Sequence, residues 1–269
     1  MQSNDRVSSK FVSYLTVGLL MVPAIVCSQS AKSGEEFLEK VADIPMPGPA
    51  ARFDYQCLDA EGGRLYISHM NADQLVVFDI TTRQVVANLD GFKRVHGVIV
   101  VPEINRVYAS ITGEHAMAVV DSKSLQTIAK PGPINYPDGL AYAPKVKRVF
   151  VSDERGDTDA VVDATNNTLV KSIPLGGGAG NTVYDAVSEK ILVAVHGVNE
   201  LDTIDPASAT IVGKLSLPGI KNPHGIALDT ASHVAFVAGE ENHSLALVDL
   251  IWVNFLRIST LPLSPSATR

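Results

Sequence analysis

Side chains that can bind cations or polar ligands recur along this chain at a nearly constant spacing. The recurring positions are Asp54, His96, Asp138, Gly180 with Asn181 beside it, and His224. The first four are 42 residues apart. Carboxylate and imidazole groups could together hold a divalent cation or hydrogen-bond a small polar molecule. The alternative is structural, because an Asp or His before Gly can satisfy backbone amides at the start of a strand.

A second set of polar residues lies about 15 residues after each of these positions. It comprises His69, Asn71, Glu114, His115, Asp153, Glu154, His196, Asn199, Glu240, Glu241, Asn242 and His243. If the two sets meet in space, the candidate metal ligands are Asp138, Asp153, Glu154, His96, His224 and Glu240. No HExxH or CxxC spacing supports a particular metal. A divalent cation such as calcium is therefore one option, and no cofactor is predicted with certainty.

The elements that would position these side chains form an internal repeat. Arg64, Arg106, Arg148 and Lys190 open the segments RLYIS, RVYAS, RVFVS and KILVA, each 42 residues after the last. Asp79, Asp121, Asp163 and Asp205 close the matching segments LVVFD, MAVVD, AVVD and LDTID at the same interval. A fifth copy runs from His224 to Asp249, slightly out of phase. Two markers in phase predict a repeat architecture.

Each copy contains short runs rich in Val, Ile, Leu, Tyr and Phe, separated by Gly, Pro, Asn and Asp, which is typical of strands and tight turns. Four strands in about 42 residues are the content of one β-propeller blade. The sequence therefore predicts an all-β propeller of four-stranded antiparallel blades, with about five blades present.

The first strand of each blade lies nearest the propeller axis. Its first residues should therefore gather at the mouth of the central channel. This places Asp54, His96, Asp138, Asn181 and His224 in a predicted ligand-binding site.

The two ends of the chain differ from the repeat. Residues 1–28 have basic residues before an apolar run and small residues after it, which predicts a secretory signal peptide. An uncleaved membrane anchor and a lipidated Cys27 are the alternatives. We expect residues 29–38 to be a linker, 39–250 the propeller repeats and 251–269 an off-pattern tail. The protein should then be periplasmic or secreted in a bacterium, with no membrane span after cleavage.

The ends also bear on how the ring is completed. Glu39 to Pro47, EKVADIPMP, resembles a fourth strand followed by a loop, so we expect it to supply the outer strand of the last blade. A closed five-blade ring is then one interpretation. The other is an incomplete propeller of a seven-blade type, favoured because apolar Leu250, Ile251 and Trp252 replace the turn residues after Asp249.

Composition and motifs exclude several classes of function. The formal net charge is -7 and no run of basic residues occurs, which argues against general nucleic-acid binding. The glycines of LGGGAGN, residues 175–181, are not followed by the Lys-Ser/Thr of a phosphate loop. No GxSxG nucleophile motif is present. We expect a monomer whose partner is a small molecule, a peptide or a protein.

The segments RLYISHMNADQLVVFDITTRQVVANL and KNPHGIALDTASHVAFVAGEENHSLALVDL resemble the YVTN family of propeller repeats, found in YncE-like exported proteins. The resemblance extends from about Val41 to Asp249, and members of this family usually close as seven blades. It implies an exported binding or scaffold protein. PDGLA followed by VFVSD is also similar to a segment of gluconolactonase-like propellers. That similarity implies the alternative of a metal-dependent lactonase-type hydrolase, in which a cation held by Asp138, Asp153 and Glu154 would polarise a lactone carbonyl and activate water.

Overall fold

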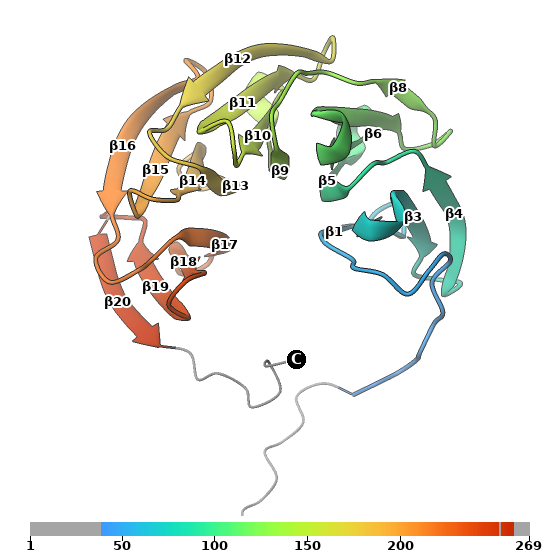
Figure 1. Ribbon diagram of the computed structural model, residues 1–269, viewed down its shortest axis with the longest axis horizontal. Helices are drawn as coiled ribbons and strands as arrows, with labels where there is room; N and C mark the ends of the chain where they lie inside the picture. The colour runs from blue at the N-terminus through green and yellow to red at the C-terminus, as the bar shows by residue number, and fades with distance from the viewer. Residues whose placement is uncertain (1–38, 253, 261–269) are drawn as a thin grey trace, which may run out of the picture. The chain divides into compact units, whose positions relative to one another are not determined.

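The chain folds into four-stranded antiparallel sheets, as the repeat predicts. The computed structural model describes residues 39–252 and 254–260. The chain divides into a segment up to Asp43 and a compact unit that begins at Ile44. Within this unit there are five sheets, each with its strands in sequence order (Figure 1). The expected signal peptide, Cys27 and linker lie outside the described residues.

The strands follow one layout in every sheet. Sheet 1 consists of β1 (Gln56–Asp59), β2 (Arg64–His69), β3 (Gln74–Asp79) and β4 (Gln84–Asp90). Sheet 2 consists of β5 (Val95–Val101), β6 (Arg106–Ile111), β7 (Ala116–Asp121) and β8 (Thr127–Ala129). Sheet 3 consists of β9 (Pro137–Ala143), β10 (Arg148–Asp153), β11 (Thr158–Asp163) and β12 (Thr168–Pro174). Sheet 4 consists of β13 (Ala179–Asp185), β14 (Lys190–Val195), β15 (Glu200–Asp205) and β16 (Thr210–Ser216). Sheet 5 consists of β17 (Pro223–Asp229), β18 (Val234–Gly239), β19 (Ser244–Asp249) and β20 (Asn254–Thr260).

Short 3₁₀ turns complete several strand connections. They are η1 (Met70–Ala72), η2 (Pro102–Ile104), η3 (Thr112–Glu114) and η4 (Pro144–Val146). None of the helical segments in the described ranges is long and apolar enough to cross a membrane.

An aspartate ends the third strand of each sheet and shapes the hairpin that follows. In sheet 1 the Asp79 carboxylate accepts hydrogen bonds from the backbone amides of Thr81, at 2.9 Å, and Thr82, at 2.7 Å. These bonds, with that of Thr82 the strongest, lower the pKa of Asp79 because they favour the charged form. The turn is therefore fixed by a local side chain, which explains why Asp recurs there.

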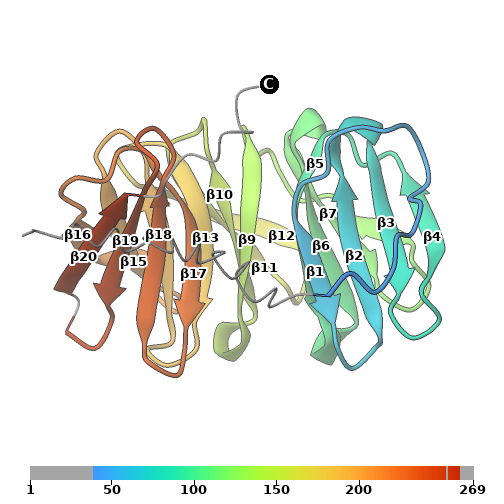
Figure 2. The same cartoon turned by 90° about the horizontal axis from the view of Figure 1, so that it is seen from below.

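The sheets pack face to face through one recurrent large side chain. Tyr66, Tyr108, Phe150 and Leu192 occupy equivalent positions in the second strands of sheets 1 to 4. Each is buried in the core between its own sheet and the next. The innermost strands β1, β5, β9, β13 and β17 line the inner side of the arc, and the fourth strands lie outside (Figures 1 and 2). This arrangement is that of propeller blades.

The fourth strand of sheet 5 comes from the C-terminal residues, which corrects one prediction. β20 pairs antiparallel with β19, from Asp249 opposite Asn254 to Ser244 opposite Thr260. The described residues from Glu39 to Pro47 contain no strand, so the expectation that they supply the outer strand of the last blade was wrong. The Asp249 carboxylate accepts bonds from the amides of Ile251 and Trp252, so the usual turn forms despite its apolar composition.

The first and last sheets have different outer faces. In sheet 1, Ile67, Val76 and Phe78 are buried beneath Ile44 and Met46. In sheet 5 the corresponding outer face carries half-buried side chains, alternating with buried ones along β18 and β19.

The arc between these two sheets is open within the described unit. Figure 1 shows the opening between the strands of sheet 5 and those of sheet 1. No strand of sheet 5 packs against sheet 1 in this unit as the strands of neighbouring sheets do. The five sheets of the described residues therefore do not form the closed five-blade ring.

Candidate functional site

Four of the five predicted site residues lie at the starts of innermost strands, and Asp54 lies two residues before β1. His96, Asp138, Asn181 and His224 belong to β5, β9, β13 and β17. We call these five residues the channel mouth. The structure brings members of different sheets together: Tyr55, next to Asp54, donates a hydrogen bond from its hydroxyl to the Asn181 side-chain oxygen, across 126 positions of sequence. Nε2 of His224 lies 3.7 Å from Oδ2 of Asp138.

Glycines allow the innermost strands of neighbouring sheets to approach this closely. A Cβ on Gly97 would lie 2.1 Å from the carbonyl oxygen of Asp138, closer than any real contact. A Cβ on Gly180 would lie 2.9 Å from Cα of His224. The equivalent of Gly97 in sheet 5 is Gly225, whose Cβ would meet nothing nearer than Ala238 at 3.7 Å. The absence of a side chain at Gly97 and Gly180 therefore brings the channel mouth together.

Replacing Gly97 with alanine should destabilise the protein and displace β9 from β5. The new methyl group must push away a backbone carbonyl, and such overpacking costs about 1–3 kcal/mol. Gly225→Ala is the matched control, because it makes the same change at the same repeat position where there is room. Urea denaturation should show the loss for Gly97→Ala, and less than about 1 kcal/mol for Gly225→Ala. Equal effects of the two changes would contradict the close-approach role.

Asp138 is the buried acid of the channel mouth. Its exposed fraction is 5%, and its Oδ1 atom has no hydrogen-bond partner within the described residues. The pKa of Asp138 is raised to about 7, mainly by burial and then by the negative charges of Asp54 and Glu154, against a smaller lowering by Arg52. The hydroxyl of Ser110 donates to the Asp138 backbone oxygen at 2.6 Å, which holds the main chain at this point. A buried carboxyl oxygen without a hydrogen-bond partner lowers the stability of the fold, so stability does not explain why Asp138 lies there.

Tyr55 and Arg52 contribute to the channel mouth although the sequence did not single them out. Burial raises the pKa of the Tyr55 hydroxyl, as do the charges of Asp138 and Asp54. Nη2 of Arg52 lies 3.3 Å from Oδ2 of Asp54 in a largely exposed ion pair. A signal for Tyr55 was present in the sequence, because it occupies the repeat position that Gly97 and Gly139 hold in the next two sheets.

His96 is neutral at ordinary pH and its ring orientation is fixed. Its Nδ1 lies 2.7 Å from the backbone oxygen of Arg94 and 2.8 Å from Oγ1 of Thr112. Since Thr112 donates its hydroxyl hydrogen to the Pro137 backbone oxygen, these contacts assign the proton of His96 to Nδ1. Burial lowers the pKa of His96. Nε2 is then a hydrogen-bond acceptor, 3.4 Å from the hydroxyl of Tyr136.

A second imidazole lies beside His224. The ring centroids of His196 and His224 are 5.1 Å apart. Burial lowers the pKa of His196, and so does the neighbouring charge of His224. Nε2 of His196 is buried with no hydrogen-bond partner in the described residues. His196 belongs to the loop set of the sequence prediction, which therefore reaches the channel mouth at this point.

Other candidate residues have structural roles. The Asp153 carboxylate accepts hydrogen bonds from the backbone amides of Asn135, Tyr136 and Gly156, so it shapes a loop. His69 is buried and stacks on Phe53, with ring centroids 4.1 Å apart. Glu240 is exposed, and its charge acts on His196.

The predicted metal ligands do not form one group. Across residues 39–252 and 254–260, no three His, Cys, Asp or Glu side chains are placed to hold a metal ion together. Asp138, Asp153, Glu154, His96, His224 and Glu240 thus remain separate in this structure. Within this set, Oδ2 of Asp138 and Nε2 of His224 lie 3.7 Å apart.

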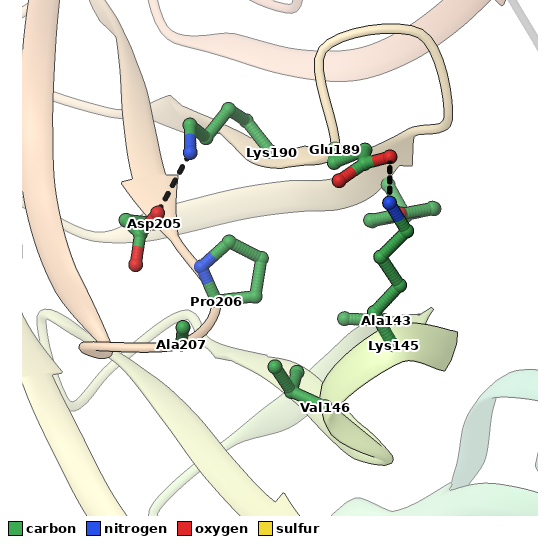
Figure 3. A pocket seen from close by; sticks show the side chains of 9 residues that line it. Ala143, Lys145, Val146, Glu189, Lys190, Asp205, Pro206 and Ala207 are labelled. Atoms are coloured by element: carbon green, nitrogen blue, oxygen red, sulfur yellow. Dashed lines mark hydrogen bonds and ion pairs between the residues drawn. The ribbon is translucent and has the colours of Figure 1, made fainter.

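A cavity at the opposite end of the sheets is structural. It has a volume of about 150 Å³ and lies between sheets 3 and 4, where Ala143 ends β9 (Figure 3). Its charged groups pair with one another: Lys145 with Glu189, and Nζ of Lys190 with Oδ2 of Asp205 at 2.7 Å. Arg148 donates to the backbone oxygens of Pro206 and Ala207. These bonds join neighbouring blades, and the polar groups that would recognise a ligand are already engaged.

Comparison with known proteins supports the fold. No family model matches the chain, and no curated protein sequence matches it. Among solved structures, the chain is similar to hydrazine synthase of Kuenenia stuttgartiensis, with a TM-score of 0.59 and 16% sequence identity. The similarity covers 84% of this chain and 90% of that one. At this identity the likeness shows the fold alone, which agrees with the five four-stranded sheets of a β-propeller.

Proposed function

We propose that this protein is an exported β-propeller of the YVTN type that binds a small polar ligand at the channel mouth. The observation that carries the proposal is the state of Asp138, a carboxyl that is 5% exposed and has one oxygen without a partner in the described residues. A buried acceptor of this kind loses its hydration without regaining a hydrogen bond, unless a ligand supplies one. The resemblance of the repeats and the predicted signal peptide support the family and the location.

The arrangement around Asp138 supports ligand binding in preference to a purely structural role. The carboxylate of Asp153 has a structural role, because its oxygens accept hydrogen bonds from backbone amides. The Asp138 carboxyl has no such bonds among the described residues, and its Oδ2 lies 3.7 Å from Nε2 of His224. Other polar groups of the channel mouth are held in fixed orientations: Tyr55 bonds to Asn181, and His96 bonds to the backbone of Arg94. Fixed polar groups around a free acceptor are what a specific small-molecule site requires.

The sequence raised two other readings, a peptide partner and a hydrolase. A peptide partner would need contacts extending beyond the channel mouth. A metal-dependent hydrolase would need several ligands converging on one point. We therefore propose ligand binding. The screen described next includes lactones, so that their hydrolysis would also be detected.

The test is a thermal-shift screen of small polar molecules, including lactones, at pH 8 against three proteins. They are the native chain, Asp138→Asn and Asp159→Asn. Asp159 is the matched control because it is also buried, and burial raises its pKa to about 7, but it lies on the third strand of sheet 3. We expect compounds that raise the melting temperature of the native chain and of Asp159→Asn, with at least a tenfold loss of affinity in Asp138→Asn. Compounds that act equally on all three would contradict the site, and hydrolysis of a lactone would replace binding by catalysis.

A further inference from the structure

We infer that the protein has a second ligand site, on the outer face of sheet 1, which binds a small uncharged molecule bearing a hydroxyl group. The site is a cavity of about 370 Å³ formed by the segment that precedes β1, blue in Figure 1, and by β2. Its lining combines Ile44, Met46 and Phe53 with two prolines and His69. No residue of the channel mouth lines it, so this site is independent of the function proposed above.

His69 gives this cavity a polar wall with unused hydrogen-bonding groups. Its exposed fraction is 1%, and neither Nδ1 nor Nε2 has a hydrogen-bond partner in the described residues. The stack on Phe53, with ring centroids 4.1 Å apart, fixes the plane of the ring but uses neither nitrogen. Gln74 lies opposite His69 on β3, and its Oε1 is also buried without a partner there. A ligand that bonds to these atoms would restore the hydrogen bonds that they lose on folding.

The repeat shows that packing alone does not require a histidine at this position. The last residue of the second strand is Ile111 in sheet 2 and Val195 in sheet 4, both 0% exposed. An aliphatic side chain fills the place without burying a polar atom, so an imidazole with two unpartnered nitrogens is the less stable choice. In sheet 3 the same position holds Asp153, whose carboxylate is bonded to backbone amides. Only in sheet 1, among these four, is the position both polar and without a hydrogen-bond partner in the described residues.

The segment above the ring can shift to admit a ligand. It is attached to sheet 1 by apolar packing, and within the described part of the chain the backbone of residues 44–51 forms no hydrogen bond. Gly48 covers the unpartnered atoms: a Cβ on it would lie 2.8 Å from Oε1 of Gln74 and 3.6 Å from Nδ1 of His69. A small displacement of this segment therefore opens both atoms to the cavity without breaking a hydrogen bond.

The chemistry of the lining favours an uncharged ligand with a hydroxyl group. Apart from His69, every residue of the lining is apolar, so a charged ligand would lose its hydration without gaining an opposite charge. A neutral imidazole has one N–H donor and one acceptor nitrogen, and the oxygen of Gln74 is a further acceptor. A hydroxyl group both donates and accepts, so it complements this set. The rest of the ligand should be an aromatic ring, which packs well against the sulfur of Met46 and the ring of Phe53.

Four probes of nearly equal size separate the elements of this inference. Benzyl alcohol carries the ring and the hydroxyl group, and toluene carries the ring alone. Benzoate and benzylammonium add a negative and a positive charge. Binding of each is measured at pH 8 by chemical-shift titration of the protein. Benzyl alcohol should bind about tenfold more tightly than the other three, which corresponds to one net hydrogen bond.

Two variants and a matched control locate the binding. His69→Phe keeps the aromatic stack and removes both nitrogens, so it should bind benzyl alcohol only as tightly as toluene, with no loss of melting temperature. Ala50→Trp places a large side chain in the cavity from its exposed rim and should abolish binding of every probe. Ala42→Trp makes the same change at an exposed alanine outside the lining and should bind like the native chain.

The inference is overturned if toluene binds the native chain as tightly as benzyl alcohol, or if His69→Phe binds benzyl alcohol without loss. Either result would leave His69 as a packing residue alone. Tighter binding of benzoate or benzylammonium would overturn the choice of an uncharged ligand. Binding that persists in Ala50→Trp, or no binding of any probe to the native chain, would contradict the site itself.

Discussion

Replacing Phe150 with alanine should lower the free energy of unfolding by about 3–5 kcal/mol, the range found for large aromatic side chains in well-packed cores. Phe150 is 0% exposed in the core between sheets 3 and 4, where it packs with residues of β14 such as Ile191 and Val193. The alanine variant would leave a cavity between two blades that the surrounding strands cannot fill. Urea denaturation measures the loss directly.

The matched control is Phe236→Ala, which makes the same change at the equivalent position of sheet 5. Phe236 is half-buried on the outer face of that sheet, opposite Leu247, and its neighbours Ala235 and Val237 are the residues that face sheet 4. We expect a loss of about 1 kcal/mol or less, because little apolar surface is newly exposed. A loss for Phe236→Ala as large as that for Phe150→Ala would show that the outer face of sheet 5 is covered in solution.

The sequence predicts the blades because their rules are local and repeated. Asp79, Asp121, Asp163 and Asp205 each fix a turn through bonds to the next few amides, so their spacing marks the third strand directly. The assignment of β20 failed for the opposite reason. The apolar composition of Ile251 and Trp252 argued against a turn, although the Asp249 carboxylate is sufficient to form it.

The site was predicted less completely because it depends on contacts between blades. The repeat identifies which residues begin the innermost strands, and in the structure Oδ2 of Asp138 lies 3.7 Å from Nε2 of His224. The sequence could not show that the Asp153 carboxylate accepts hydrogen bonds from the backbone amides of Asn135 and Tyr136, since these residues precede it by more than fifteen positions. It also missed Tyr55, whose role depends on a contact with sheet 4.

Replacing Asp138 with asparagine should stabilise the protein at alkaline pH. The folded-state pKa is raised from 3.8 to about 7, so the folded chain holds a proton there that the unfolded chain releases. Below about pH 4 the carboxyl is protonated in both the folded and the unfolded chain, so its raised pKa does not change the free energy of unfolding. As the pH rises from about 4 to about 7, the free energy of unfolding falls. A shift of about three pKa units corresponds to at most about 4 kcal/mol.

The stability of Asp138→Asn relative to the native chain should thus rise from near zero at pH 3 towards a few kcal/mol at pH 8.5. Denaturation at several pH values measures this difference. Asp79→Asn provides a control of opposite sign, because backbone hydrogen bonds lower the pKa of Asp79 and its charged form stabilises the fold. A flat difference for Asp138→Asn across this range would contradict the burial of an ionisable, unpaired carboxyl. A buried acid that lowers the free energy of unfolding is expected where the same group binds a ligand.

The most direct measurement is a pH titration of the Asp138 side-chain carboxyl by carbon-13 NMR, with the resonance assigned through Asp138→Asn. The structure predicts a midpoint near 7, set mainly by burial and then by the charges of Asp54 and Glu154. A midpoint near 4 would contradict the account of the channel mouth as a site built around a buried acid.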